Sequence, residues 1–274
     1  MKCKLQVAAV ALVVFFSFSA DLLAQTTAAE EMTLGVQAYK QSRFGEAIQH
    51  FEKCVALAPE NTNAHLYLAT AYAQQFIPGA DSPENNRMAE RAIDQYQHVL
   101  DGKPVPSARI NSTKGIAYLY LQMNQLDDSK KYYLMALDLD PDDPENYYSI
   151  SALDWAICYR PRQEERAKLG MQPDDSLPVA NRKVCAAMKE KNSANVQEGI
   201  DDLKKALKIR PDYLDAMAYM NLMYRERADI QCDDPAALSA DLKTADEWLE
   251  RIMATKKAIT EKNKPTTEPS ATPQ

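Results

Sequence analysis

The sequence predicts an all-α chain made of stacked helix pairs, and three observations carry this prediction. Glycine is scarce, with 7 in 274 residues, while strong helix formers such as alanine, leucine, lysine and glutamate are abundant. A spacing of small and large residues that is typical of one packed helix face occurs four times. Where the repeat is regular its period is about 34 residues, a length that fits one helix-turn-helix unit.

The repeated spacing marks the second helix of each pair. Its first copy is Ala47, Phe51 and Cys54, followed by Pro59. The small first residue lets two helices approach closely, the larger residue fills the space between them, and the proline ends the helix. The same steps of 4, 3 and 5 residues recur three more times along the chain, at Ala92-Tyr96-Val99-Pro104, Ser129-Tyr133-Ala136-Pro141 and Gly199-Leu203-Ala206-Pro211.

The first helices carry matching marks, which are Leu34-Gly35, Leu68-Ala69 with Tyr72, Ile116-Ala117 with Tyr120, and Met220-Asn221 with Tyr224. Together with the second-helix pattern, these residues resemble the tetratricopeptide repeat family over about residues 28–258. The resemblance implies a right-handed solenoid of about five helix-turn-helix repeats. We place the repeats at about 28–61, 62–106, 110–143, 144–213 and 214–258, within a solenoid domain of residues 25–260.

Three of these repeats are longer than 34 residues, so we expect inserts in repeats 2, 4 and 5. The first is a turn-rich loop near residues 77–85. The largest, at about 161–193, starts at Pro161 and includes a helix from about Pro178 to Lys191. The third lies near 230–234. The helix after it, from Pro235 to about Thr260, carries an apolar stripe that is suited to capping the end of a stack.

The N-terminus has the pattern of a secretory signal peptide, residues 1–24. Lys2 and Lys4 precede an apolar run that is too short to span a bilayer as a helix. Cleavage after Ala24 is expected, with cleavage after Ala20 or an uncleaved anchor as alternatives. We therefore expect an exported, bacterial-type protein in the periplasm or another extracytoplasmic compartment, with no stable membrane insertion after cleavage. Residues 261–274 contain three prolines and nothing apolar larger than alanine, so a disordered tail is expected.

Charge and motifs argue against several functions. With 32 basic and 39 acidic residues, the net charge is −7, which disfavours nucleic acid as a partner. His50, His65 and His98 have no second ligand at metal-binding spacing, and no phosphate-binding or nucleophile motif is present. We expect no catalytic residue, no cofactor and no metal site. The acidic stretches at 138–143 and 233–234 are better explained as helix ends and N-caps than as calcium loops.

Four cysteines follow the signal peptide, and an even number in an exported chain permits disulfides. Cys54 occupies a small, buried position of its repeat and is expected to be a packed thiol. The other three lie near the irregular parts, where loops of adjacent repeats share one edge of the stack. We predict a disulfide that anchors the insert through Cys185, with Cys158 or Cys232 as its partner.

In tetratricopeptide proteins the first helices line the concave face, where ligands usually bind. By position, the resemblance implies a binding surface on this face, although any of its residues could instead fill contacts between repeats. The basic clamp with which some family members hold a terminal carboxylate is not reproduced, because Tyr67 and Tyr118 stand at supporting positions. The candidate binding residues are Tyr39, Lys40, Asn63, Asn111, Lys114, Tyr118, Gln122, Tyr148, Trp155 and Arg225.

These observations favour an exported protein–protein interaction module or scaffold, with a protein or peptide of unknown identity as its partner. Aromatic side chains on a groove can anchor such a partner. Two alternatives remain open. One is an envelope protein that binds a small ligand or a glycan, and the other is the accessory domain of an envelope enzyme.

Overall fold

The computed structural model describes residues 27–80, 82–172 and 175–263. Over these residues the chain is made of α-helices and short connections, without a β-strand. The predicted signal peptide at 1–24 and all but the first three residues of the predicted tail lie outside the described residues. The chain divides into two compact units, one ending at Leu139 and the other beginning at Asp140, and each is described by itself.

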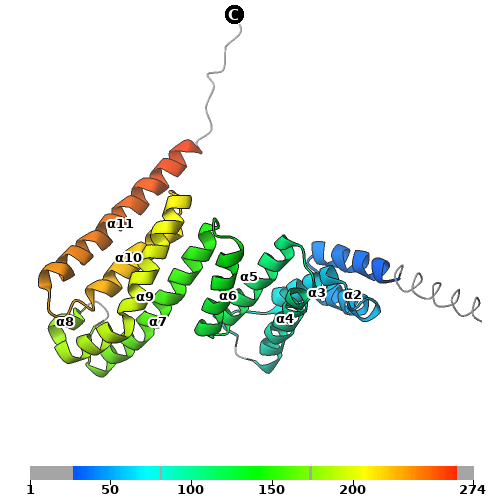
Figure 1. The fold of residues 1–274 in the computed structure, drawn as a ribbon, viewed down its shortest axis with the longest axis horizontal. Helices are drawn as coiled ribbons and strands as arrows, with labels where there is room; N and C mark the ends of the chain where they lie inside the picture. The colour runs from blue at the N-terminus through cyan, green and yellow to red at the C-terminus, as the bar shows by residue number, and fades with distance from the viewer. Residues whose placement is uncertain (1–26, 81, 173–174, 264–274) are drawn as a thin grey trace, which may run out of the picture. The chain divides into compact units, whose positions relative to one another are not determined.

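The first unit contains three helix pairs (Figure 1). A helix that includes residues 27–40 pairs with α2 (Phe44–Leu57), α3 (Thr62–Gln75) pairs with α4 (Pro83–Asp101), and α5 (Pro106–Gln122) pairs with α6 (Leu126–Leu139). Each of these helices contacts the next, and α3 also contacts α5. First helices of neighbouring pairs therefore lie side by side, as expected for stacked helix-turn-helix repeats.

Two tight turns within these pairs end a helix on a residue with positive φ. Ser42 has φ 59° and Asn124 has φ 62°. In each turn the next residue donates a backbone hydrogen bond to the carbonyl five positions earlier, Arg43 to Ala38 and Gln125 to Tyr120. This is the Schellman arrangement, which satisfies carbonyls at a helix end.

The loop of the second pair is held by one buried side chain. Asn85 accepts a hydrogen bond from the backbone N–H of Ile77 at 2.7 Å and donates to the carbonyls of Ile77 and Ala80 at 2.9 and 2.7 Å. Ser82 caps α4 by accepting from the backbone N–H of Asn85. Of the insert expected near residues 77–85, the described residues 77–80 and 82 lie between α3 and α4, and residues 83–85 form the start of α4.

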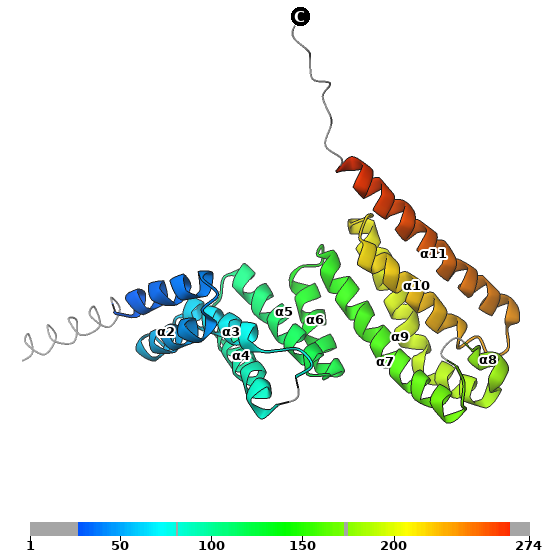
Figure 2. The same ribbon diagram turned by 180° about the vertical axis from the view of Figure 1, so that it is seen from behind.

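The second unit contains α7 (Pro144–Lys168), the short α8 (Leu177–Ala180), α9 (Arg182–Ile209), α10 (Leu214–Ala228) and α11 (Pro235–Lys262). In both views α7, α9 and α10 run side by side (Figures 1 and 2), and all three contact one another. Asp143 and Asp234 cap α7 and α11 through their carboxylates, each followed by a proline at the start of the helix. The capping role expected for both acidic stretches is confirmed.

The secondary structure of the large insert differs from the prediction. We expected a break at Pro161 and a separate helix from about Pro178 to Lys191. Instead α7 continues through Pro161 to Lys168, and the expected insert helix begins at Arg182 and merges with the second helix of the repeat. Gly170, with φ 66°, then ends α7 in a third Schellman turn.

A proline removes one backbone hydrogen bond and disfavours the helix interior. Here the residues after Pro161 supply compensating contacts, because Arg162 and Arg166 are buried against the rest of the unit. The inserted residues therefore lengthen α7 and α9, and the non-helical connection shrinks to a short stretch on either side of α8.

All members of the small–large–small pattern lie in the interior. Ala47, Phe51, Cys54, Ala92 and Val99 have no exposed area, and the corresponding residues of the later copies are also buried, namely Tyr96, Ser129, Tyr133, Ala136, Gly199, Leu203 and Ala206. A Cβ at Gly199 would lie 1.9 Å from Met223 Cε, so a larger residue there would require the end of the Met223 side chain to move. The all-α helix-pair fold with inserts in repeats 2, 4 and 5 is confirmed.

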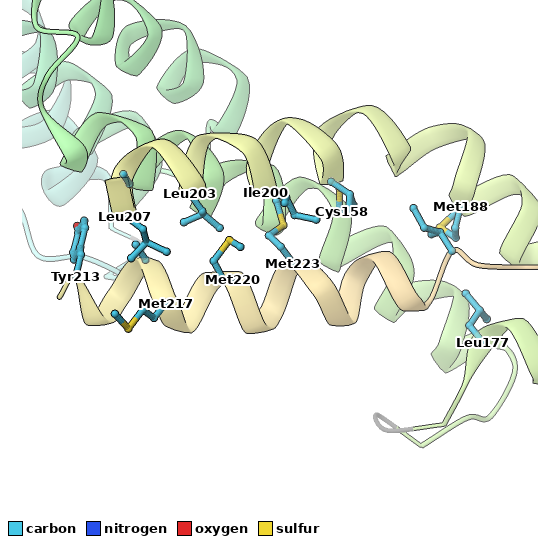
Figure 3. Close-up of a cluster of buried hydrophobic side chains, with 14 of the residues drawn as sticks. Cys158, Leu177, Met188, Ile200, Leu203, Leu207, Tyr213, Met217, Met220 and Met223 are labelled. Carbon is cyan, nitrogen blue, oxygen red and sulfur yellow. The ribbon is translucent and has the colours of Figure 1, made fainter. Parts of the chain in front are cut away.

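The core of the second unit lies where α9 faces α10 (Figure 3). Ile200, Leu203 and Leu207 of α9 oppose three methionines of α10 that are almost fully buried, Met217, Met220 and Met223. Methionine is flexible and fills irregular space well. The core continues to Leu177 of α8, so the insert is packed against the same cluster.

Candidate functional site

The second unit carries a row of aromatic rings where its two first helices, α7 and α10, meet. We call this row the aromatic ladder, and it runs through Tyr213, Tyr148, Tyr219, Trp155 and Tyr159. Successive ring centroids are 5.3, 5.3, 5.8 and 4.5 Å apart. Residues 148, 155 and 159 share one face of α7 because they are 7 and 4 positions apart. Such ring contacts fix the side chains and leave amphipathic surface for a ligand.

An arginine lies over each end of the ladder. Arg210 stands 4.2 Å from the centroid of Tyr213 and bonds to Glu145 at 2.8 Å. Burial, together with the hydrogen bond from Tyr213 to Glu145, raises the pKa of the Tyr213 hydroxyl well above its usual range. At the other end Arg162 lies 5.3 Å from the centroid of Tyr159.

The ladder ends in a pocket of about 320 Å³. Its lining joins an aromatic pair with charged groups from α7 and α10, and we name it the arginine–tryptophan pocket. The lining residues that matter here are Trp155, Tyr159, Arg162, Arg166, Arg225 and Asp229. Its walls therefore come from both first helices of the unit, and Leu242 of α11 closes one side.

The floor of the pocket is a buried ion cluster. Arg162 Nε lies 3.0 Å from Glu226 Oε2, and both Arg162 and Arg166 bind Asp229 Oδ2, the latter at 3.0 Å. Glu226 has no exposed area and Arg166 is 2% exposed. Burial raises the pKa of the Glu226 carboxyl to about 7, against the opposing effect of Arg162.

The same buried ion cluster also holds the insert in place through hydrogen bonds. Arg166 Nη2 donates to the carbonyls of Gln172, at 3.1 Å, and Asp175. The connection between α7 and α8 is thus hydrogen-bonded to the helix that lines the pocket. A buried charge needs such partners, since an unpaired one would be strongly destabilising.

A disulfide joins Cys185 of α9 to Cys232 of the connection before α11, with Cα atoms 5.6 Å apart. Of the two partners that the sequence left open for Cys185, the structure therefore has Cys232. Cys158 is a buried free thiol in the interior of α7, and Cys54 is a buried free thiol in the first unit. Cys158 sits deep in the core because α7 runs past it for ten more residues.

Three of the predicted binding residues gather at this site. Trp155 and Arg225 line the pocket, and Tyr148 belongs to the ladder. The other seven belong to the first unit, whose residues do not line this pocket. Among them Lys40, Asn63, Asn111 and Tyr118 are exposed, while Tyr39, Lys114 and Gln122 are half-buried.

Two of these seven residues have contacts of different kinds within the first unit. Tyr39 packs its ring on Phe44 with a centroid distance of 5.3 Å. Gln122 lines a separate hollow of about 320 Å³ together with Phe76 and Met123. The role of these residues in binding stays a prediction.

Sequence reasoning missed Tyr159 and Asp229 as site residues, and it assigned Arg162 and Arg166 to the insert and not to a helix that lines the pocket. A signal was present, because Trp155, Tyr159, Arg162 and Arg166 follow steps of 4, 3 and 4 and so share one helix face. The expectation that Pro161 ends the helix separated the two aromatics from the two arginines and hid the pattern.

Residues 115–143 match the family model of the tetratricopeptide repeat. This stretch of the chain is therefore a tetratricopeptide repeat. The matched stretch includes the C-terminal part of α5 and all of α6. No curated protein matches this chain in sequence.

Solved structures with a similar fold are tetratricopeptide-repeat proteins as well. A crystal structure of the MamA protein aligns with 90% of this chain and 98% of its own at 11% identity, with a TM-score of 0.56. MamA from residue 41 onward of Desulfovibrio magneticus RS-1 aligns with 85% and 96% at 12% identity and a TM-score of 0.55. YrrB, described as a tetratricopeptide-repeat protein with an unusual peptide-binding site, aligns with 84% and 90% at 11% identity and a TM-score of 0.51. Because the sequence identities are this low, these comparisons show only that the chain has a similar fold.

None of the described helices combines the length and the apolar character that crossing a membrane requires. Among the same residues, no three histidine, cysteine or acidic side chains are grouped so that they could hold a metal ion.

Proposed function

We propose that this tetratricopeptide-repeat protein is an interaction module that binds a segment of a protein partner on the first-helix face of its second unit. The observation that carries the proposal is the arginine–tryptophan pocket at the end of the aromatic ladder. Aromatic and arginine side chains in a partly dry pocket are the residue types that dominate protein-binding energies. The fold gives them a rigid base, because both helices that line the pocket pack on the methionine-rich core.

Export to an oxidising compartment is part of the proposal. The disulfide between Cys185 and Cys232 supports it, since such bonds form and persist outside the reducing cytosol. The N-terminal sequence pattern points in the same direction. The peptide-binding site in the printed description of YrrB belongs to that protein, and here it only makes a peptide ligand a reasonable expectation.

Co-purification from the cells that make the protein tests the proposal, with wild type and Trp155→Ala compared side by side. A stoichiometric protein partner that is retained by wild type and lost by Trp155→Ala supports it. Met253→Ala, which removes an apolar side chain that is 64% exposed on α11 and does not line the pocket, is the control and should retain the partner. Retention of a sugar or a glycan fragment instead of a protein would favour the small-ligand alternative. Unchanged helical content by circular dichroism shows that the variants are folded.

A further inference from the structure

We infer that the arginine–tryptophan pocket receives an internal aspartate or glutamate side chain of the partner segment, beside an aromatic or apolar residue that packs on Trp155 and Tyr159. This inference rests on the proposed function and adds the chemistry of the ligand to it. Three properties of the pocket support it, namely its unused hydrogen-bond donors, its local charge and its continuation into the ladder.

The hydrogen-bonding atoms that remain available in the pocket are mainly donors. The indole N–H of Trp155 and the hydroxyl of Tyr159 have no partner among the described residues. Arg162 forms an ion pair with Glu226 through its buried Nε and donates a hydrogen bond to Asp229 from Nη1, which leaves its Nη2. The main buried acceptor, Asp229 Oδ2, is already shared by two arginines. A ligand group that accepts several hydrogen bonds therefore fits better than one that donates them.

The local charge is also favourable for an anion. The lining contains three arginines, Arg162, Arg166 and Arg225, against the carboxylates of Asp175 and Asp229, although the whole chain carries a net charge of −7. Glu226 lies beneath the lining without exposed area. Because burial raises the pKa of Glu226 to about 7, this carboxyl offsets only part of the positive charge at neutral pH.

Arg225 is the lining arginine that can turn toward a ligand. Its side chain is 45% exposed, and its partner Asp246, at 2.8 Å, is 67% exposed. Ion pairs between exposed side chains contribute little and are easily exchanged. An acidic side chain that enters the pocket would meet Arg225 in a less hydrated setting, where a charge-assisted hydrogen bond is stronger.

The aromatic ladder explains why the acidic residue should be internal to the segment. It continues from the pocket past the half-buried rings of Tyr219 and Tyr148 and ends at the buried ring of Tyr213. Extended chain advances about 3.3 Å per residue, so several residues of the partner can lie along these rings while one side chain enters the pocket. A free chain end is not required for this placement.

The experiment is a selection of random dodecapeptides, each displayed between fixed linkers so that no terminal carboxylate is presented. The full-length protein is the target. We expect aspartate or glutamate to be enriched at one position, next to an aromatic or large apolar residue. Replacing that acid by its amide should weaken binding of the selected peptide by roughly tenfold or more, since hydrogen bonds to charged groups are worth more than neutral ones. Raising the salt concentration should weaken it further.

Two variants separate the possible outcomes. Arg225→Gln should reduce the preference for the acid over its amide, while Arg251→Gln on the exposed part of α11 should leave it unchanged. Selected peptides that depend on Trp155 but show no preference for acids would overturn this inference and leave the proposed function standing. Enrichment of basic residues would also overturn it. Failure to select any peptide that depends on Trp155 would count against both.

Discussion

Arg162 Nε lies 3.0 Å from Oε2 of Glu226, yet neither atom makes a well-aligned hydrogen bond. Glu226 is fully buried, and its surroundings include Arg162, Arg166 and Asp229. Attraction by Arg162 offsets part of the cost of burying the carboxylate, while repulsion by Asp229 adds to that cost. The balance raises the pKa of Glu226 and makes the floor of the pocket sensitive to pH.

Glu226 should make the protein less stable as the pH rises toward neutrality. In the unfolded chain a glutamate titrates at about 4.3, whereas in the folded chain Glu226 keeps its proton up to about pH 7. The folded state binds more protons between these values, so the free energy of unfolding falls as the pH rises through this window. The contribution is on the order of 3 kcal/mol.

Denaturant unfolding of wild type and Glu226→Gln between pH 4.5 and 8 measures this contribution. The decline should be shallower in Glu226→Gln, because the amide does not titrate. Glu250→Gln, at an exposed position of α11, is the control and should follow wild type. Parallel curves for all three proteins would show that Glu226 is not the group responsible.

The disulfide should stabilise the second unit. Cys185 and Cys232 enclose a long segment of chain, and linking them restricts the unfolded state, an effect typically worth about 2–4 kcal/mol. Reduction, or the double change Cys185→Ser with Cys232→Ser, should lower the free energy of unfolding by this amount. Reductant should then have no further effect on the double variant.

Alkylation of the unfolded, unreduced protein followed by mass spectrometry tests the pairing itself. Cys54 and Cys158 should be labelled, and Cys185 and Cys232 should not. Labelling of all four would show that the native protein lacks this bond.

Ala92 should not tolerate a larger side chain. It has no exposed area where α4 packs on its neighbours, and overpacking a filled core typically costs about 1–3 kcal/mol. Ala92→Leu should therefore lower the free energy of unfolding by this amount in denaturant titrations. Ala187→Leu places the same side chain on an exposed position of α9 and should have little effect. Equal behaviour of the two variants would contradict the packing role of Ala92.

Most of the fold could be predicted from the sequence because its signals are local. The spacing of Ala47, Phe51 and Cys54 indicates that they share one face of a helix. A proline or a polar turn residue indicates where a helix ends. The large insert could not be predicted in the same way. Pro161 is an unfavourable helix residue by itself, and it is tolerated because buried contacts of Arg162 and Arg166 hold the helix beyond it.

The candidate site was predicted only in part for a related reason. Trp155 and Arg225 could be placed on the first helices by their position in the repeat. Glu226 has no exposed area and the side chain of Asp229 is 15% exposed, and both pair with Arg162 on the part of α7 beyond Pro161. This pairing could not be predicted because Pro161 was expected to end the helix. The choice between Cys158 and Cys232 likewise depended on how far α7 extends beyond Cys158.

The disulfide also determines how the second unit would carry mechanical load. Cys185 and Cys232 are 47 positions apart, and the segment between them contains all of α10 and most of α9. A force pulling on the two ends of the chain passes through the sulfur–sulfur bond and bypasses that segment. The fully extended length is thereby shortened by roughly 150 Å. Under tension α7 and α11 can unravel, while the chain of α10 inside the covalent ring is not itself stretched.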